Sequence, residues 1–219
     1  LRHPFGDGSP GFVRIGTKPY RHDGMKLGRD GRWNVDPDPP ARRSPQDDGV
    51  FGLSGTRAVP ESDASWSARV VSRDAPAEQP ARFELSYNLP AGSSFTLDLG
   101  GRKLRVDAKV AADVAASGIA HLALQAPLKS QLRLGAERGS PRLFGVIIER
   151  SGKPGVVLDT LGIDGARLET PLAWNEAAFV DEVARRSPEL LVVAFGTNEA
   201  FDALKVEKYA AHLGDLVRR

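Results

Sequence analysis

An unbroken run of apolar residues, residues 190–195, stops abruptly at Gly196-Thr197-Asn198-Glu199. The run has the length of a strand, and its lack of alternation requires both faces to be buried, as in a central parallel strand. Open α/β sheets bind their ligands at the carboxyl ends of such strands. The run therefore favours an α/β layer fold with a site at its polar end.

Residues 155–166 form a second unit of the same kind, a short apolar strand that leads into a glycine-rich turn. Between the two units, residues 174–186 carry apolar side chains at helical spacing, and Ser187-Pro188 ends the pattern. The order strand, helix, strand predicts a β-α-β unit. We expect its two turns to meet at the site, and a last helix to begin near Val206.

Residues 65–150 show a different sequence pattern, in which short runs of alternating apolar and polar residues are separated by turn residues. Phe95, Leu97 and Leu99 point one way while Thr96 and Asp98 point the other, which is the period of a strand with one buried face. Leu99-Gly100-Gly101-Arg102 is typical of a two-residue hairpin turn. Seven such runs predict an antiparallel sandwich. The runs are residues 67–72, 81–87, 94–99, 103–107, 121–125, 131–134 and 144–149.

The remaining segments give weaker signals. Residues 1–60 are rich in Gly, Pro and Asp and have few periodic stretches, which is typical of turns and loops. Residues 110–117 predict one or two helical turns. The first residue is Leu1 rather than Met, and the sequence stops inside the last helical pattern, so we expect the chain to be a fragment of a longer protein.

The composition excludes several classes of function. Of the 219 residues, 41% are hydrophobic and 26% are charged, as in ordinary globular proteins. A net charge of +2 with scattered Lys and Arg gives no basic patch, so we expect no nucleic-acid partner. The absence of cysteine excludes disulfides and thiolate metal sites. No apolar run is long enough to span a bilayer, and no signal peptide is recognisable.

Asn198 and Gly165 are the candidate site residues. An Asn that follows a buried strand can aim its side-chain N–H at a developing oxyanion, although Asn is equally common as the N-cap of a helix. A Gly at a strand-to-helix turn can offer its backbone N–H to an anion, although a plain turn glycine is the alternative. The glycines of this segment do not form the dinucleotide-binding fingerprint.

The two turns together resemble two conserved blocks of the SGNH (GDSL-type) hydrolases. Thr160-Leu-Gly-Ile-Asp-Gly165-Ala is similar to the second block. Pro188-Glu-Leu-Leu-Val-Val-Ala-Phe-Gly-Thr-Asn198-Glu is similar to the third block, with Glu199 where Asp is usual. Residues 5–13, and the order in which the blocks and the sandwich follow one another, resemble the peptidoglycan O-acetylesterase-like subgroup, which carries an inserted carbohydrate-binding-module-like sandwich.

The resemblance implies a flavodoxin-like three-layer α/β/α fold, present in part, with an inserted antiparallel β-sandwich of the jelly-roll type. Residues 1–60 would be the N-terminal part of the SGNH domain, 61–152 the sandwich, and 153–219 the SGNH domain continued. Gly165 would supply a backbone N–H, and Asn198 a side-chain N–H, to the oxyanion hole. The family's Gly-Asp-Ser nucleophile and its Asp-x-x-His pair have no counterpart here, so we expect residues 1–219 alone to be inactive.

The implied function is a metal-free and cofactor-free serine esterase that removes O-acetyl groups from a peptidoglycan-like carbohydrate, in a secreted or periplasmic location. An O-acetyltransferase that uses the same site is an alternative. A second alternative is a non-catalytic carbohydrate-binding or scaffolding protein in which the sandwich carries the function. The few aromatic residues of the predicted sandwich weaken a stacking-platform form of that alternative.

Overall fold

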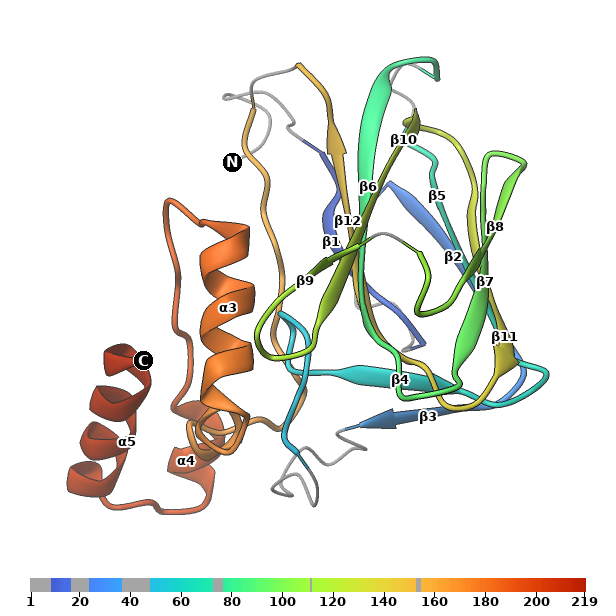
Figure 1. The fold of residues 1–219 in the computed structure, drawn as a ribbon. Helices are drawn as coiled ribbons and strands as arrows, with labels where there is room; N and C mark the ends of the chain where they lie inside the picture. Colours follow the sequence, from blue (N-terminus) through green and yellow to red (C-terminus); the bar gives the residue numbers. More distant parts are fainter. Residues whose placement is uncertain (1–8, 17–23, 37–47, 73–76, 111, 153–154) are drawn as a thin grey trace.

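The computed structural model of the chain describes residues 9–16, 24–36, 48–72, 77–110, 112–152 and 155–219 (Figure 1). Of the segment 5–13, which carried part of the family resemblance, residues 5–8 lie outside this description. The described residues form two antiparallel sheets packed face to face, followed by a helical segment at the C-terminal end.

The larger sheet has seven strands and the smaller sheet has five. The larger sheet runs in the order β3 (Trp33–Asp36), β4 (Arg57–Pro60), β12 (Arg142–Arg150), β6 (Pro80–Asn88), β10 (Ala120–Pro127) and β9 (Asp113–Val114), and β1 (Gly11–Arg14) also pairs with β12. The smaller sheet runs in the order β2 (Met25–Asp30), β5 (Ser65–Val70), β11 (Leu132–Arg138), β7 (Ser94–Leu99) and β8 (Arg102–Val106).

The alternating pattern of residues 65–150 correctly predicted a sandwich. Each of the seven predicted runs overlaps a strand, with ends that differ by a few residues, and Leu99 pairs with Arg102 across the predicted hairpin turn. Residues that alternate into the space between the sheets form the core, including Trp66, Leu97 and Leu134. The rings of Tyr87 and Phe95 meet edge to face there, with centroids 5.3 Å apart.

The helical turns expected at residues 110–117 are absent from the described part of that segment. Asp113 and Val114 form β9, which pairs with β10. The backbone N–H of Ala115 donates to the carbonyl of Ile119, so the chain folds back on itself within a few residues. Pairing with the neighbouring strand satisfies the backbone here without a helix.

Residues 11–60 contribute strands to both sheets. β1 pairs with β12, β2 pairs with β5, and β3 reaches the larger sheet through β4. Trp33 of β3 is buried in the same core as the strands of residues 65–150. This part of the chain shows few periodic stretches because its strands are short, at four to six residues each.

Four helices follow the sandwich: α2 (Glu169–Leu172), α3 (Glu176–Arg186), α4 (Thr197–Phe201) and α5 (Val206–Arg218). The two longer ones, α3 and α5, confirm the predicted helices. The side chain of Asn175 caps α3 by accepting a hydrogen bond from the backbone N–H of Ala178, and Ser187 ends the helix. Figure 1 shows α3, α4 and α5 gathered on one side of the sandwich.

The expected three-layer α/β/α fold is wrong: the described chain is mainly an antiparallel β-sandwich. The run taken for a central parallel strand forms no strand, and Leu190, Leu191 and Val192 are 79%, 54% and 72% exposed. Residues 157–163 form no strand either. A central parallel strand needs hydrogen-bonded neighbours and covered faces, and among the described residues neither segment pairs with a strand of a sheet. The apolar composition of these two segments does not show whether other strands pair with them.

Candidate functional site

A tight turn at residues 163–168, here called the Gly165 turn, holds the first candidate residue. The backbone N–H of Ala166 donates to the carbonyl of Ile163 at 3.1 Å, and Gly165 has a φ of +74°, which favours glycine. A Cβ at Gly165 would meet nothing within 4 Å. Among the described residues, the Gly165 N–H donates no hydrogen bond. The turn thus has a free backbone donor beside open space.

The segment Gly196–Glu199, here called the Asn198 turn, holds the second candidate residue. The side-chain amide nitrogen of Asn198 donates to the carbonyl of Ala166 at 2.8 Å. This bond uses one of the two N–H groups of the amide and leaves the other available. The N-cap of α4 is Gly196, so Asn198 does not cap that helix. The structure therefore brings Asn198 beside the turn that contains Gly165.

Glu199 joins the two turns through its carboxylate. Its Oε1 accepts the backbone N–H of Leu168 at 2.7 Å, and its Oε2 accepts the backbone N–H of Gly196 at 3.0 Å. Glu199 is 4% exposed, and Leu168 is fully buried. In the sequence, Glu199 stands out only as a departure from the family pattern. An acid three positions after a glycine N-cap is half of a capping box, and that signal could have identified it.

Arg167 makes a second connection between the turns. Its Nε donates to Asp202 Oδ2 at 2.5 Å, just beyond α4, and its guanidinium also donates to the carbonyl of Gly165 at 3.0 Å. The Asp202 side chain is 41% exposed, so water competes for this pair. The Gly165 turn is therefore held to α4 by one buried carboxylate and one solvated ion pair.

Asp159 anchors the strand-like segment before the Gly165 turn to the sandwich. Its carboxylate accepts the backbone N–H of Phe12 on β1 at 2.8 Å and the Nε of Arg186 on α3 at 2.5 Å. Burial alone would lower the pKa of Arg186, but the hydrogen bond and charge of Asp159, together with Glu149, outweigh it, and the net shift is upward. Arg186 thus remains charged and paired at the junction.

A cluster of titratable side chains lies between α3 and the larger sheet. His121 on β10, Glu84 on β6 and Glu182 on α3 are each no more than 5% exposed. Arg185 on α3 donates to both oxygens of Glu84, at 3.0 and 3.2 Å, and to Asp113 on β9 at 2.5 Å. The hydrogen bond and charge of Arg185 lower the pKa of Asp113. The cluster fixes α3, which connects the two turns, on the sheet.

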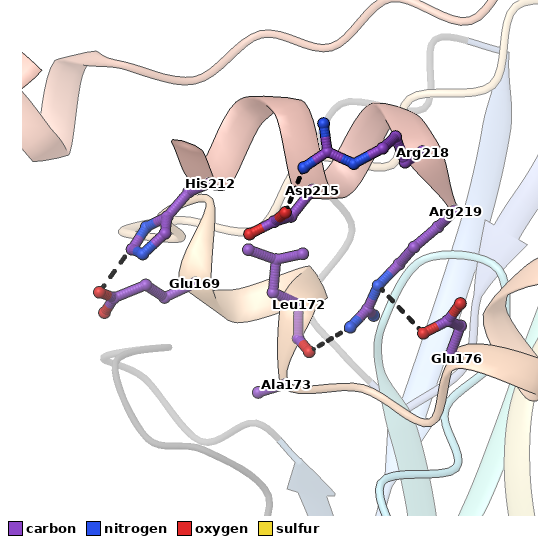
Figure 2. Close-up of a pocket in the computed structure, with 8 residues that line it drawn as sticks. All are labelled: Glu169, Leu172, Ala173, Glu176, His212, Asp215, Arg218 and Arg219. Carbon is purple, nitrogen blue, oxygen red and sulfur yellow. Dashed lines mark hydrogen bonds and ion pairs between the residues drawn. The ribbon is translucent and has the colours of Figure 1, made fainter. Parts of the chain in front are cut away.

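An open groove of about 590 Å³ lies beside α2 and α5. Figure 2 shows His212 directed toward Glu169 and Arg219 directed toward the carbonyl of Leu172. Neither Gly165 nor Asn198 lines this groove. The groove and the candidate site are therefore separate features of the helical segment.

The aromatic side chains of the predicted sandwich, residues 61–152, are all buried, so none of them offers a ring to a sugar at the surface. They are Trp66, Phe83, Tyr87, Phe95 and Phe144. Within the described ranges, no group of three or more His, Asp or Glu side chains is placed to hold a metal ion. No helix in this part of the chain is long and apolar enough to cross a membrane.

No protein-family model and no curated protein sequence matches the chain. Among solved structures, a peptidoglycan O-acetylesterase aligns over 99% of this chain with a TM-score of 0.69 and 21% sequence identity. A CBM35 domain from Paenibacillus barcinonensis aligns over 64% of this chain and 98% of its own length, with a TM-score of 0.36 and 11% identity. An exo-beta-1,3-galactanase from Phanerochaete chrysosporium aligns over 56% of this chain and 27% of its own length, with a TM-score of 0.34 and 10% identity.

The first of these similarities concerns the whole described architecture. The chain shares its fold with a part of the peptidoglycan O-acetylesterase, and it spans 57% of that protein's length. The TM-scores of the other two are too low to establish a common fold. The similarity thus establishes the fold of this chain but not its activity.

Proposed function

We propose that the Gly165 turn and the Asn198 turn form the oxyanion hole of a serine esterase that removes O-acetyl groups from a carbohydrate. The observation that carries this proposal is the 2.8 Å hydrogen bond from Asn198 to Ala166, the residue next to Gly165. It brings a side-chain amide donor beside a turn whose Gly165 N–H has no acceptor among the described residues. An oxyanion hole is commonly built from N–H donors such as these.

The chemistry follows from these donors. A serine hydroxyl attacks the acetyl carbonyl carbon, a base accepts the serine proton, and the carbonyl oxygen becomes an oxyanion. The Gly165 N–H and the second N–H of Asn198 would bind that oxygen more strongly as its charge develops. In the proposed enzyme, the serine and its base are supplied outside residues 1–219. The base then gives the proton it took from serine to the departing sugar oxygen. This leaves an acetyl-serine, which water hydrolyses.

The choice of a glycan acetyl ester rests on the fold. The chain shares its architecture with part of a peptidoglycan O-acetylesterase, and that similarity supports a carbohydrate as the alcohol portion of the ester. A peptidoglycan-like substrate would place the protein in the cell envelope or outside the cell. The burial of the five sandwich aromatics argues against a stacking platform as the main function.

The test measures acetate release from O-acetylated peptidoglycan by the longest natural polypeptide that contains residues 1–219. We expect the wild-type protein to release acetate and Asn198→Ala to lose most of that activity. Asn175→Ala is the matched control, because it also removes an Asn at the start of a helix but lies at α3. It should release acetate at the wild-type rate.

Three other outcomes would overturn the proposal. Acetylation of an added glycan without release of acetate into water would identify a transferase. Binding of the glycan without turnover would favour a carbohydrate-binding protein. Equal activity of the wild type and Asn198→Ala would remove the oxyanion assignment.

A further inference from the structure

Glu199 is a buried carboxylate that the proposed reaction does not use. Each of its two oxygens accepts one backbone N–H, and the two donors come from segments far apart in the sequence, at Leu168 and Gly196. The side chain is 4% exposed. Because both oxygens are occupied and shielded from water, Glu199 is not placed to take a proton from a substrate.

These two hydrogen bonds fix the distance between the two turns. Leu168 lies three residues after Gly165, and Gly196 lies two residues before Asn198. The Glu199 carboxylate therefore links the backbone close to Gly165 with the backbone close to Asn198. Hydrogen bonds to an ionised acceptor are about twice as strong as neutral ones. The other connection with a charged acceptor, Arg167 to Asp202, is partly solvated and weaker.

Oxyanion stabilisation depends steeply on donor position, because a displacement of about 1 Å can reduce a reaction rate about a hundredfold. We infer that Glu199 is the positioning residue of the candidate oxyanion hole: its carboxylate sets the separation of the Gly165 N–H from the Asn198 side chain. This inference rests on the proposed function. The role of Glu199 differs from the roles of Gly165 and Asn198, because Glu199 would touch neither the substrate nor the reacting atoms.

Glu199→Gln is the decisive substitution, because glutamine has nearly the same shape but only one acceptor oxygen. Its amide nitrogen would face one of the two backbone N–H donors and could not accept from it. In the acetate-release assay we expect kcat to fall roughly 10- to 100-fold, with KM within about twofold of the wild type. Glu199→Asp restores two acceptor oxygens on a shorter stem and should recover part of the lost kcat.

Glu182→Gln is the matched control, because it also neutralises a buried acid but lies on α3 against His121, away from both turns. It should lower stability while leaving kcat within about twofold of the wild type. In residues 1–219, NMR should also show that Glu199→Gln shifts the side-chain amide signals of Asn198 and that Glu182→Gln does not. Both measurements are made well below the unfolding temperature of each variant.

The outcomes separate the two proposals. If Asn198→Ala loses activity while Glu199→Gln retains the wild-type kcat, the positioning role is overturned and the proposed function stands. An equal loss of kcat in Glu199→Gln and Glu182→Gln would reduce Glu199 to a stabilising residue. If the wild-type protein releases no acetate, the proposed function is overturned and the positioning role is lost with it.

Discussion

His121 and Glu182 lie against each other across the junction between the larger sheet and α3. The imidazole Nε2 is 2.9 Å from the Glu182 Oε1, and the two side chains are 3% and 5% exposed. The two atoms lie in contact but do not meet the geometric requirements of a hydrogen bond. One β10 residue and one α3 residue therefore couple the sandwich to the helical segment.

A double-mutant cycle should measure that coupling. We expect His121→Ala and Glu182→Ala each to destabilise the chain, with a coupling energy of about 0.5–3 kcal/mol, because the two groups share a buried contact. Lys208 and Glu169 provide a control cycle, since they are 3.0 Å apart but each 56% exposed. That exposed pair should give about 0–1 kcal/mol in urea unfolding. Equal coupling in both cycles would contradict the buried role of His121.

Asn198→Asp tests the charge at the candidate oxyanion hole. The substitution replaces an N–H donor with a carboxylate that repels both the oxyanion and the carbonyl of Ala166. We expect a loss of kcat of roughly a hundredfold or more, at least as large as that of Asn198→Ala, with little change in KM. Steady-state kinetics on an acetyl ester would check this. A variant that turned over as fast as the wild type would rule out a negative charge developing near Asn198.

Two alanine substitutions test which apolar residues form the core. Phe95 is fully buried, so Phe95→Ala should cost about 3–5 kcal/mol of unfolding free energy. Leu190 is 79% exposed, so Leu190→Ala should change stability by less than about 0.5 kcal/mol. Chemical denaturation of residues 1–219 measures both. A large cost at Leu190 would mean that its segment is packed after all.

Two glycines test how closely the loop before β4 packs against the helical segment. A Cβ at Gly55 would lie 1.9 Å from the ring of Trp174, whereas a Cβ at Gly152 would meet nothing within 4 Å, and both residues have positive φ. We expect Gly55→Ala to cost about 2–4 kcal/mol, and Gly152→Ala only the backbone strain of about 1–2 kcal/mol. Thermal unfolding would rank the two. Equal losses of stability would show that the Trp174 ring can move to accommodate a methyl group at position 55.

The pKa of Asp113 gives a prediction for acid pH. The Arg185 hydrogen bond and charge lower this pKa in the folded state, so the pair contributes stability above the unfolded value of about 4 and loses it as the pH falls further. Asp113→Asn should therefore show a flatter decline of stability below pH 4 than the wild type. Urea unfolding across pH 2–7 measures this, and 1 M salt should reduce the difference because the pair is exposed.

The sandwich could be predicted because alternation records which face of each strand is buried. Phe95, Leu97 and Leu99 carry that information within six residues, and the Gly-Gly turn between β7 and β8 is a local signal. The same holds for α3, whose cap and end are encoded at Asn175 and Ser187. Local patterns were sufficient where local contacts decide the structure.

The fold class could not be predicted from the run at residues 190–195, because burial of a strand depends on partners elsewhere in the chain. The junction residues were missed for a similar reason. His121 was placed correctly in a sandwich strand, but its neighbours Glu84 and Glu182 are distant in sequence, and nothing local marks them as partners. Gly165 and Asn198 remain predicted site residues, whereas the contact of Glu199 with Leu168 required the three-dimensional structure.

The exposed run at residues 190–195 has a consequence for handling the protein. Leu-Leu-Val-Val-Ala-Phe contains no charge, no proline and no glycine, and high β-propensity with these features is the signature of segments that stack between chains. Because its backbone forms no strand with any described residue, the run can pair with a copy of itself. Residues 1–219 should therefore self-associate at high concentration, and Val192→Lys should raise their solubility.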